Sequence, residues 1–355
     1  MKSSQSALAG AVVHWQAEHG RSHLPWQNTR DPYRVWLSEI MLQQTQVATV
    51  LGYYARFLER FPDVASLAAA TEDEVLALWS GLGYYSRARN LHRCARQVVQ
   101  LHGGRFPPSA EVLQTLSGIG RSTAGAIAAF CFSERVAILD ANVRRVLTRV
   151  LGFDGDLSVA QNERELWALA TKLLPEDDLE QTMPRYTQGL MDLGATVCLP
   201  RKPLCLLCPL QSRCVALQQS QPERYPVKTR KLVRKAETWW LLLLRDPGTA
   251  PGAARIWLER RPAKGIWAGL YCLPVHASQS ALLEHPAVAG ASGASSCTAL
   301  AAFVHVLTHR DLHLHPVLVD VSMATDASPE AGWFARDQWQ AMGLPAPIRK
   351  LLDSL

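Results

Sequence analysis

The sequence predicts two domains, a mainly α-helical domain followed by a smaller α+β domain. Apolar residues recur at intervals of three and four from about residue 5 to residue 215, which is the period of helices. From about residue 237 the pattern changes to the short alternating runs that are typical of strands. The chain has 355 residues, enough for two or three domains with sizeable apolar cores.

Glycine and proline divide the helical region into short helices. Val35, Leu37, Ile40 and Met41 give one apolar face at helical spacing. We expect helices to end at Pro62, Gly81-Leu82-Gly83, Gly103-Gly104 and Pro107-Pro108. We therefore expect residues 1–215 to form one domain of short helices.

The C-terminal region, residues 237–355, carries the strand pattern. The expected strands are residues 238–244, 255–260, 302–307 and 312–321, and a short helix is expected near 348–352. The stretch 289–296, rich in alanine, serine and glycine, is expected to be a surface loop.

A polar and basic stretch, residues 216–236, separates the two regions and is predicted to be a linker. Its basic residues are Arg224, Lys228, Arg230, Lys231, Arg234 and Lys235. This linker could lie along a phosphate backbone or be only a solvated tether, and the sequence favours neither.

Composition bounds the class of protein. The formal net charge is +6, a moderate excess that is compatible with a polyanion partner. No run of eighteen apolar residues is present, so we expect neither a transmembrane helix nor a membrane partner. The N-terminal residues lack the pattern of a secretion signal. We therefore expect an intracellular, cytoplasmic monomer.

Four cysteines are spaced as Cys198-x6-Cys205-x2-Cys208-x5-Cys214. Disulfides are not expected in a reducing compartment. Structural zinc sites usually pair two short C-x2-4-C knuckles, and only Cys205 and Cys208 form one here. The open spacing therefore favours an all-cysteine [4Fe–4S] cluster over zinc.

Residues 109–131 have the pattern of two helices joined by a glycine hairpin. Gly118 and Gly120 permit a turn tight enough to direct backbone N–H groups outward at a helix N-terminus, where they can bind phosphate. A G-x-G sequence alone is weak evidence, because any helix–helix turn can use glycine. The whole pattern is typical of a helix-hairpin-helix, which contacts a DNA backbone without reading its sequence.

Asp140 ends an apolar run and begins a helix rich in arginine. One interpretation is an ordinary helix N-cap. The other uses the same physics, because a helix N-terminus keeps a carboxylate ionised and able to stabilise a cation or activate water.

Glu39 is the only acid in a long apolar stretch, so burial would raise its pKa and let it donate a proton near neutral pH. Gln43 and Gln44 follow it and offer amide groups suited to base edges. One protonated acid and one carboxylate anion are what cleavage of an N-glycosidic bond requires. The pair therefore predicts a glycosidic chemistry.

Residues 37–47, 81–91, 118–125 and the cysteine loop closely resemble segments of the MutY-type adenine DNA glycosylases, within the helix-hairpin-helix or endonuclease III superfamily. The resemblance implies excision of adenine mispaired with 8-oxoguanine or guanine, after base flipping, during base excision repair. It implies a double-stranded DNA partner and a nucleoid-associated location if the chain is bacterial. Ser122 stands where related lyases carry a lysine, which implies a monofunctional enzyme.

The resemblance also implies residue roles. Glu39 would protonate the adenine, Asp140 would stabilise the cationic intermediate, and Asn142 would position groups beside it. Residues around the flipped adenine would be Trp26, Gln27, Gln44, Thr45, Leu82 and Gln188, and Gln43 and Tyr84 would fill the gap that it leaves. Gly83, Gly118, Gly120 and Ser122 would join the DNA-binding set, and Cys198, Cys205, Cys208 and Cys214 would bind the [4Fe–4S] cluster.

The C-terminal region resembles the Nudix-like domain of the same family, which reads 8-oxoguanine. Residues 261–270 support the match, and Leu307-Thr308-His309 stands where the family commonly has Phe-Ser-His. Thr308 and His309 would contact 8-oxoguanine. Other possibilities are a bifunctional glycosylase/lyase, a non-catalytic DNA-binding protein and a Nudix hydrolase. Ser122 argues against the lyase, and the intact Glu39 and Asp140 argue against a non-catalytic protein. A Nudix hydrolase is not expected, because no glutamate-rich helix follows Gly269.

Overall fold

The computed structural model describes residues 2–229, 233–248, 253–289, 297–321, 328 and 330–355. It divides into two compact units, the first of residues 1–68 and 93–231 and the second of residues 69–92 and 232–355. Arg230, Lys231 and residues 290–296 of the predicted linker and loop lie outside the described residues. The domain boundaries that the sequence predicts therefore stay a prediction.

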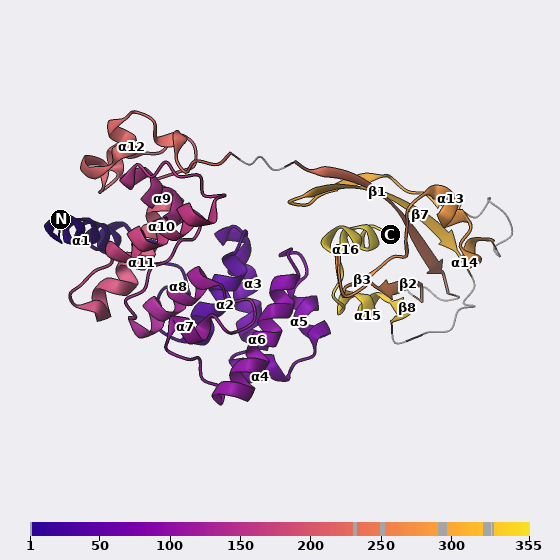
Figure 1. Ribbon diagram of the computed structural model, residues 1–355. Helices are drawn as coiled ribbons and strands as arrows, with labels where there is room; N and C mark the ends of the chain where they lie inside the picture. The colour runs from indigo at the N-terminus through magenta and orange to yellow at the C-terminus, as the bar shows by residue number, and fades with distance from the viewer. Residues whose placement is uncertain (1, 230–232, 249–252, 290–296, 322–327, 329) are drawn as a thin grey trace. The chain divides into compact units, whose positions relative to one another are not determined.

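The first unit is helical, as the sequence predicts (Figure 1). Its helices are α1 (Lys2–His19), α2 (Pro32–Leu42), α3 (Val47–Arg60), α4 (Val64–Ala69), α7 (Ala110–Leu113), α8 (Arg121–Phe132), α9 (Ala141–Leu151), α10 (Ala160–Lys172), α11 (Leu179–Thr196) and α12 (Val215–Gln218). Short 3-10 turns lie at η1 (Cys205–Leu207), η2 (Gln211–Arg213) and η3 (Pro222–Arg224). Helix α6 (Ser86–His102) begins in the second unit and continues in the first.

Local sequence explains where the important helices begin. Asp31 caps α2 by accepting a hydrogen bond from the Tyr33 N–H at 2.9 Å, and Pro32 occupies the first turn, where its missing N–H costs nothing. Asp140 caps α9 by accepting from the Val143 N–H at 2.7 Å. The local sequence therefore determines where α2 and α9 begin.

The core of the first unit packs around α9 and α11. Val143, Leu147, Leu190 and Leu193 are buried there among other aliphatic side chains. Gly194 lets the two helices approach, because a Cβ atom at this position would lie 2.5 Å from the Cβ of Asn142. The packing therefore fixes the N-terminus of α9 against α11.

The second unit is built on one eight-stranded sheet among the described residues. Its strands are β1 (Lys235–Asp246), β2 (Arg255–Arg260), β3 (Tyr271–Cys272), β4 (Val275–His276), β5 (Cys297–Ala299), β6 (Phe303–Val306), β7 (Arg310–Asp320) and β8 (Ala331–Ala335). Its helices are α5 (Glu72–Trp79), α13 (Gln279–Leu283), α14 (Pro286–Ala289), α15 (Arg336–Gln340) and α16 (Ala346–Asp353).

The sheet has the order β3-β2-β1-β7-β5, with β4 on β1, β6 on β7 and β8 on β2. The central pair β1–β7 is parallel and its register runs from Lys235 opposite Arg310 to Arg245 opposite Asp320. Leu241 to Leu244 are all buried, as expected of a strand covered on both faces. The α+β prediction is confirmed, and the strands that the sequence missed have only two to five residues, too few to show a period.

None of the helices within the described ranges is both long enough and apolar enough to cross a membrane.

The approach of α9 and α11 gives a stability prediction. Gly194→Ala places a methyl group against the backbone of Asn142, so we expect a loss of about 1–3 kcal/mol in the free energy of unfolding. The measurement is denaturant unfolding of the full chain.

Gly52→Ala is the matched control, because Gly52 lies inside α3 and an added Cβ meets nothing within 4 Å. It should raise stability by about 1 kcal/mol through helix propensity alone. Equal stability of the two variants would contradict the role of Gly194.

Candidate active site and cysteine loop

The first unit contains a large cavity of about 1290 Å³. Its walls come from the end of α1 and the segment after it, α2 and the loop after it, one face of α8, the start of α9 and one face of α11. The predicted site residues that line it are Trp26, Gln27, Glu39, Gln43, Gln44, Thr45, Ser122, Asp140, Asn142 and Gln188. Residues far apart in the sequence thus meet in one concave space, which is the usual form of a ligand site.

Glu39 projects from α2 into this cavity. Burial, and then the negative charge of Asp140, raise its pKa to about 8. Within the described part of the chain, no hydrogen bond to its carboxyl group offsets this loss of solvation. Glu39 is therefore mostly protonated at neutral pH, in the direction that the sequence predicts.

Asp140 faces the same cavity from the N-terminus of α9. Burial raises its pKa above the ordinary value, whereas the hydrogen bond from the Val143 N–H and the positive charge of Arg145 lower it. The helix end and the nearby guanidinium therefore favour the ionised form, as the sequence leads us to expect, but burial has the larger effect on the pKa. Only Asp140 has groups that stabilise its anion, so of the two acids it ionises first.

Ser122 and Asn142 are held by backbone and side-chain contacts beside the two acids. The Ser122 hydroxyl accepts a hydrogen bond from the Leu139 N–H at 3.0 Å, and Asn142 Oδ1 accepts from Arg145 Nη2 at 2.8 Å. Of the described residues that line the cavity, none is a lysine. No described lining residue therefore offers an amine that could attack a sugar.

Polar side chains of the segment after α1 and of α11 also line this cavity. Both amide atoms of Gln27 are buried without a hydrogen-bond partner, an arrangement that is costly unless something polar enters the cavity. Trp26 is buried beside it. Gln188 Nε2 donates to Asp192 Oδ1 at 2.9 Å, which fixes the orientation of the Gln188 amide.

The sequence reasoning missed two residues here, Arg21, which lines the cavity, and Asp192, which holds Arg21 and Gln188 in place. Asp192 is fully buried and accepts from Arg21 Nε at 2.8 Å and from the Arg21 N–H at 3.1 Å. Asp192 could have been found by the signal that singled out Glu39, a lone acid within an apolar helix. Arg21 follows the end of α1 and no local pattern marks it.

The glycine hairpin lies between α7 and α8. Gly118 has φ +79°, a left-handed conformation that favours glycine. Gly120 is the N-cap of α8, supplies no side chain to cap it, and has open space where a Cβ would stand. The N–H groups of the first turn of α8 are thus approachable by an anion.

The other predicted contact residues, Leu82, Gly83, Tyr84, Thr308 and His309, fall in the second unit. Tyr84 has φ +49°, unusual for a residue other than glycine, and its hydroxyl hydrogen-bonds to Thr308 Oγ1 at 2.7 Å. Arg87 Nη2 donates to the carbonyl oxygens of Leu82 and Gly83 at 3.3 Å each. Leu82-Gly83-Tyr84 and the Thr308 turn are therefore joined within one unit, whereas His309 is exposed.

The four predicted cysteines line a separate small cavity beside α9 and α11. Burial, with Cys198, Cys214 and Cys205 acting in the same direction, raises the pKa of Cys208 to about 11. Arg149 Nη1 donates to Cys198 Sγ at 3.3 Å. Among the described residues, no three histidine, cysteine, aspartate or glutamate side chains are arranged to hold a metal ion. The lining contains four thiols and no other metal-binding side chain, a donor set that fits an all-cysteine iron–sulfur cluster.

Comparisons with known proteins agree with this architecture. Residues 37–172 match the family model of the HhH-GPD superfamily base excision DNA repair proteins, and residues 249–354 match that of the NUDIX domain. The solved structure of a thermostable thymine-DNA glycosylase is 28% identical, with a TM-score of 0.54, and the match covers 61% of this chain and 98% of that one. An endonuclease III–DNA complex, at 20% identity and a TM-score of 0.51, shows the same fold.

The fold and the cavity thus define a helix-hairpin-helix protein of the base excision repair class. The adenine DNA glycosylase of Buchnera aphidicola subsp. Acyrthosiphon pisum (strain APS) is 34% identical over 349 residues, covering 97% of this chain and 96% of that protein. The human adenine DNA glycosylase is 33% identical over 411 residues, covering 98% of this chain and 73% of that protein. The chain belongs to the adenine DNA glycosylase family.

The coupling of the two acids gives a pKa prediction. Asp140→Asn removes the negative charge that raises the pKa of Glu39, so we expect this pKa to fall below about 8 while burial still holds it above the ordinary value. Titration of the Glu39 carboxyl by carbon-detected NMR measures it.

Glu165→Gln is the control, because Glu165 is exposed and does not line this cavity. It should leave the pKa of Glu39 where it is in the wild-type chain. An unchanged pKa in Asp140→Asn would show that the two carboxyl groups do not interact.

Proposed function

We propose that this protein is a monofunctional adenine DNA glycosylase that removes adenine mispaired with 8-oxoguanine or guanine. The observation that carries the proposal is the pair of carboxyl groups in one cavity, with Glu39 protonated at neutral pH and Asp140 the first of the two to ionise. The adenine must leave the duplex to reach these groups, so base flipping into the cavity is part of the proposal.

In this mechanism Glu39 donates its proton to the adenine, which makes the base a better leaving group. The Asp140 carboxylate lies behind the sugar and stabilises the positive charge that develops as the glycosidic bond breaks. Asn142, held by Arg145, orients groups beside Asp140. Gln27 and Gln188 would hydrogen-bond the edge of the base, and the entering adenine would satisfy the unpaired amide of Gln27.

The absence of lysine among the described lining residues supports net attack by water rather than by an amine. A lyase needs an amine that forms a Schiff base with the sugar. Ser122 stands at the corresponding place in the hairpin and its hydroxyl is engaged by the Leu139 N–H. Water would bond to the sugar carbon that the base leaves, and the Glu39 carboxylate, formed when the base takes its proton, would accept the proton that this water loses. We therefore propose base release without strand cleavage.

The second unit would read the base opposite the adenine. The hydrogen bond between Tyr84 and Thr308 joins a residue that would fill the gap left by the flipped adenine to a residue that would contact 8-oxoguanine. Thr308 offers a hydroxyl and His309 an imidazole, both able to bond the polar edge of an oxidised purine. We propose that these two residues distinguish 8-oxoguanine from guanine.

Cys198, Cys205, Cys208 and Cys214 would hold a [4Fe–4S] cluster. When bound, the cluster would cross-link residues 198–214 into one rigid loop. Arg149, buried beneath this loop, donates to the carbonyl oxygens of Leu199 and Pro200 at 2.7 and 3.0 Å. Arg201 and Lys202, both exposed, would present positive charge to DNA phosphates.

Single-turnover base release tests the main proposal. A duplex with adenine opposite 8-oxoguanine should lose adenine, an adenine–thymine duplex should not, and strand breaks should appear only after alkali. The rate should be highest between two limits. It should fall as pH rises through about 8, where Glu39 loses its proton, and it should also fall as pH is lowered and Asp140 becomes protonated.

Glu39→Gln should slow release at least about 100-fold and Asp140→Asn should lose most activity, while both still bind the duplex. Full activity of Glu39→Gln would exclude Glu39 as the acid. Strand breaks before alkali would instead indicate lyase chemistry.

His309→Ala tests recognition of the opposite base. We expect a loss of about tenfold in release opposite 8-oxoguanine and little change opposite guanine, because a single hydrogen bond to the lesion is removed. His313→Ala, at a residue on strand β7, is the control. Equal losses on both duplexes would place the recognition elsewhere.

A further inference from the structure

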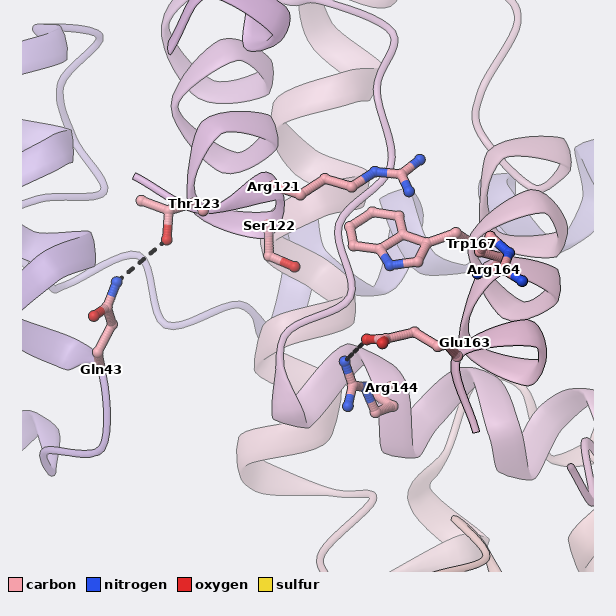
Figure 2. A pocket seen from close by; sticks show the side chains of 10 residues that line it. Gln43, Arg121, Ser122, Thr123, Arg144, Glu163, Arg164 and Trp167 are labelled. Atoms are coloured by element: carbon pink, nitrogen blue, oxygen red, sulfur yellow. Dashed lines mark hydrogen bonds and ion pairs between the residues drawn. The ribbon is translucent and has the colours of Figure 1, made fainter. Parts of the chain in front are cut away.

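The first unit has a second cavity, of about 510 Å³, whose lining side chains are drawn in Figure 2. We call it the arginine pocket and define it by Arg121, Ser122, Arg144, Glu163, Arg164 and Trp167. Gln43, Ser122 and Thr123 line both cavities, so the two share a wall. Its far side is formed by α10, a helix with no role in the site described so far.

The pocket carries an excess of positive charge. Three guanidinium groups, those of Arg121, Arg144 and Arg164, line it together with one carboxylate, that of Glu163. Glu163 pairs with Arg144, with 2.8 Å between Nη2 and Oε1. The Nε of Arg144 is buried and has no hydrogen-bond partner. A single internal carboxylate therefore leaves much of the donor capacity unused.

Arg121 is oriented but not neutralised. Its guanidinium carbon lies 3.9 Å from the centre of the Trp167 ring, and Figure 2 shows the group stacked over the indole. In the described part of the chain it has no carboxylate and no hydrogen-bond partner. Stacking uses the face of the guanidinium and leaves its N–H edge available, the geometry that binds a phosphate with two hydrogen bonds.

The first turn of α8 adds to the positive potential of the pocket. Helix α8 has twelve residues and starts at Arg121 without a side-chain cap. Its N-terminal N–H groups and its dipole favour an anion near the pocket. The arginines of the pocket would hold that anion from the side, so this contact differs from the hairpin amides alone.

We propose that the arginine pocket binds one backbone phosphate of the adenine-bearing strand next to the flipped nucleotide, and that this phosphate displaces Glu163 from Arg144. The inference rests on the proposed function, because the shared wall places this phosphate beside a nucleotide in the large cavity. Glu163 fills the place of the anion in the free protein and keeps Arg144 oriented. Its displacement costs binding energy, so removal of its charge strengthens DNA binding.

The test measures binding of the full chain to a duplex with 2′-fluoro-2′-deoxyadenosine, which resists cleavage, opposite 8-oxoguanine. Arg121→Gln should weaken binding about tenfold and reduce the slope of log K against log salt by about 0.9. Lys172→Gln removes one charge from α10 outside the pocket and should change binding less than about twofold. Equal effects of these two variants would overturn the proposal.

Glu163→Gln is expected to change DNA binding in the opposite direction. It should tighten binding about three- to tenfold, because Arg144 is released for the phosphate. Glu165→Gln, an exposed position on the same helix, is the matched control and should tighten binding less than about twofold. Weaker binding by Glu163→Gln, or equal gains in both, would overturn the exchange. Thermal unfolding identifies any variant that misfolds. Arg121→Lys then replaces Arg121→Gln; it keeps the charge, so it should weaken binding through loss of the two-hydrogen-bond contact and leave the salt slope unchanged.

The source of the phosphate is tested by methylphosphonate substitution, one position at a time along the adenine strand. One position should weaken binding by the wild-type chain about tenfold and weaken binding by Arg121→Gln clearly less, because only Arg144 and the α8 amides remain to hold that phosphate. Equal losses in the wild-type chain and Arg121→Gln at every position would overturn the assignment to one phosphate. Stabilisation by inorganic phosphate that requires Arg121, without any methylphosphonate effect, would assign the pocket to a free anion instead.

Adenine release from a cleavable duplex, measured in parallel, separates this inference from the proposed function. Normal release without the methylphosphonate pattern would overturn only the role of the pocket. The pattern without adenine release would overturn the proposed activity and leave the phosphate site standing.

Discussion

Helix α9 is the constraint on which the site depends, because it connects the carboxylate end of the cavity to the cysteine loop. Its N-terminus carries Asp140, and Arg145 donates to the carbonyl oxygens of Gly194 and Cys198 at 2.6 and 2.7 Å. One turn further on, Arg149 is 2% exposed and contacts the loop through Cys198 and Leu199. A buried guanidinium with such partners cannot be displaced cheaply, so the loop and the cavity share one rigid support.

The two carboxyl groups differ in pKa because their surroundings differ, and not because their chemistry differs. Both carboxyl groups are buried, and burial raises both pKa values. Asp140 has an N–H group and a guanidinium that stabilise its anion, whereas Glu39 has neither among the described residues. The pair therefore holds one proton over a range of pH, which is the state required for protonating a leaving base while supporting a cation.

Carboxylates also hold other polar side chains in place elsewhere in the first unit. Asp192 holds Arg21 and Gln188 at the wall of the large cavity, and Glu163 holds Arg144 in the arginine pocket. Asp192 is fully buried and does not line the cavity, so an incoming ligand cannot replace it. The Glu163 side chain is 41% exposed, so an incoming anion can replace it at lower cost.

The sequence by itself determined the elements and the chemical groups. Helical and strand periods located the two folds, because period depends only on neighbouring residues, and Glu39 was visible as a lone acid in an apolar helix. Tertiary structure alone decided that burial outweighs the helix end at Asp140, that Arg21 joins Asp192 across 171 positions, and that Arg121 stacks on Trp167. These outcomes depend on solvation and on contacts between distant segments, and no local pattern encodes either.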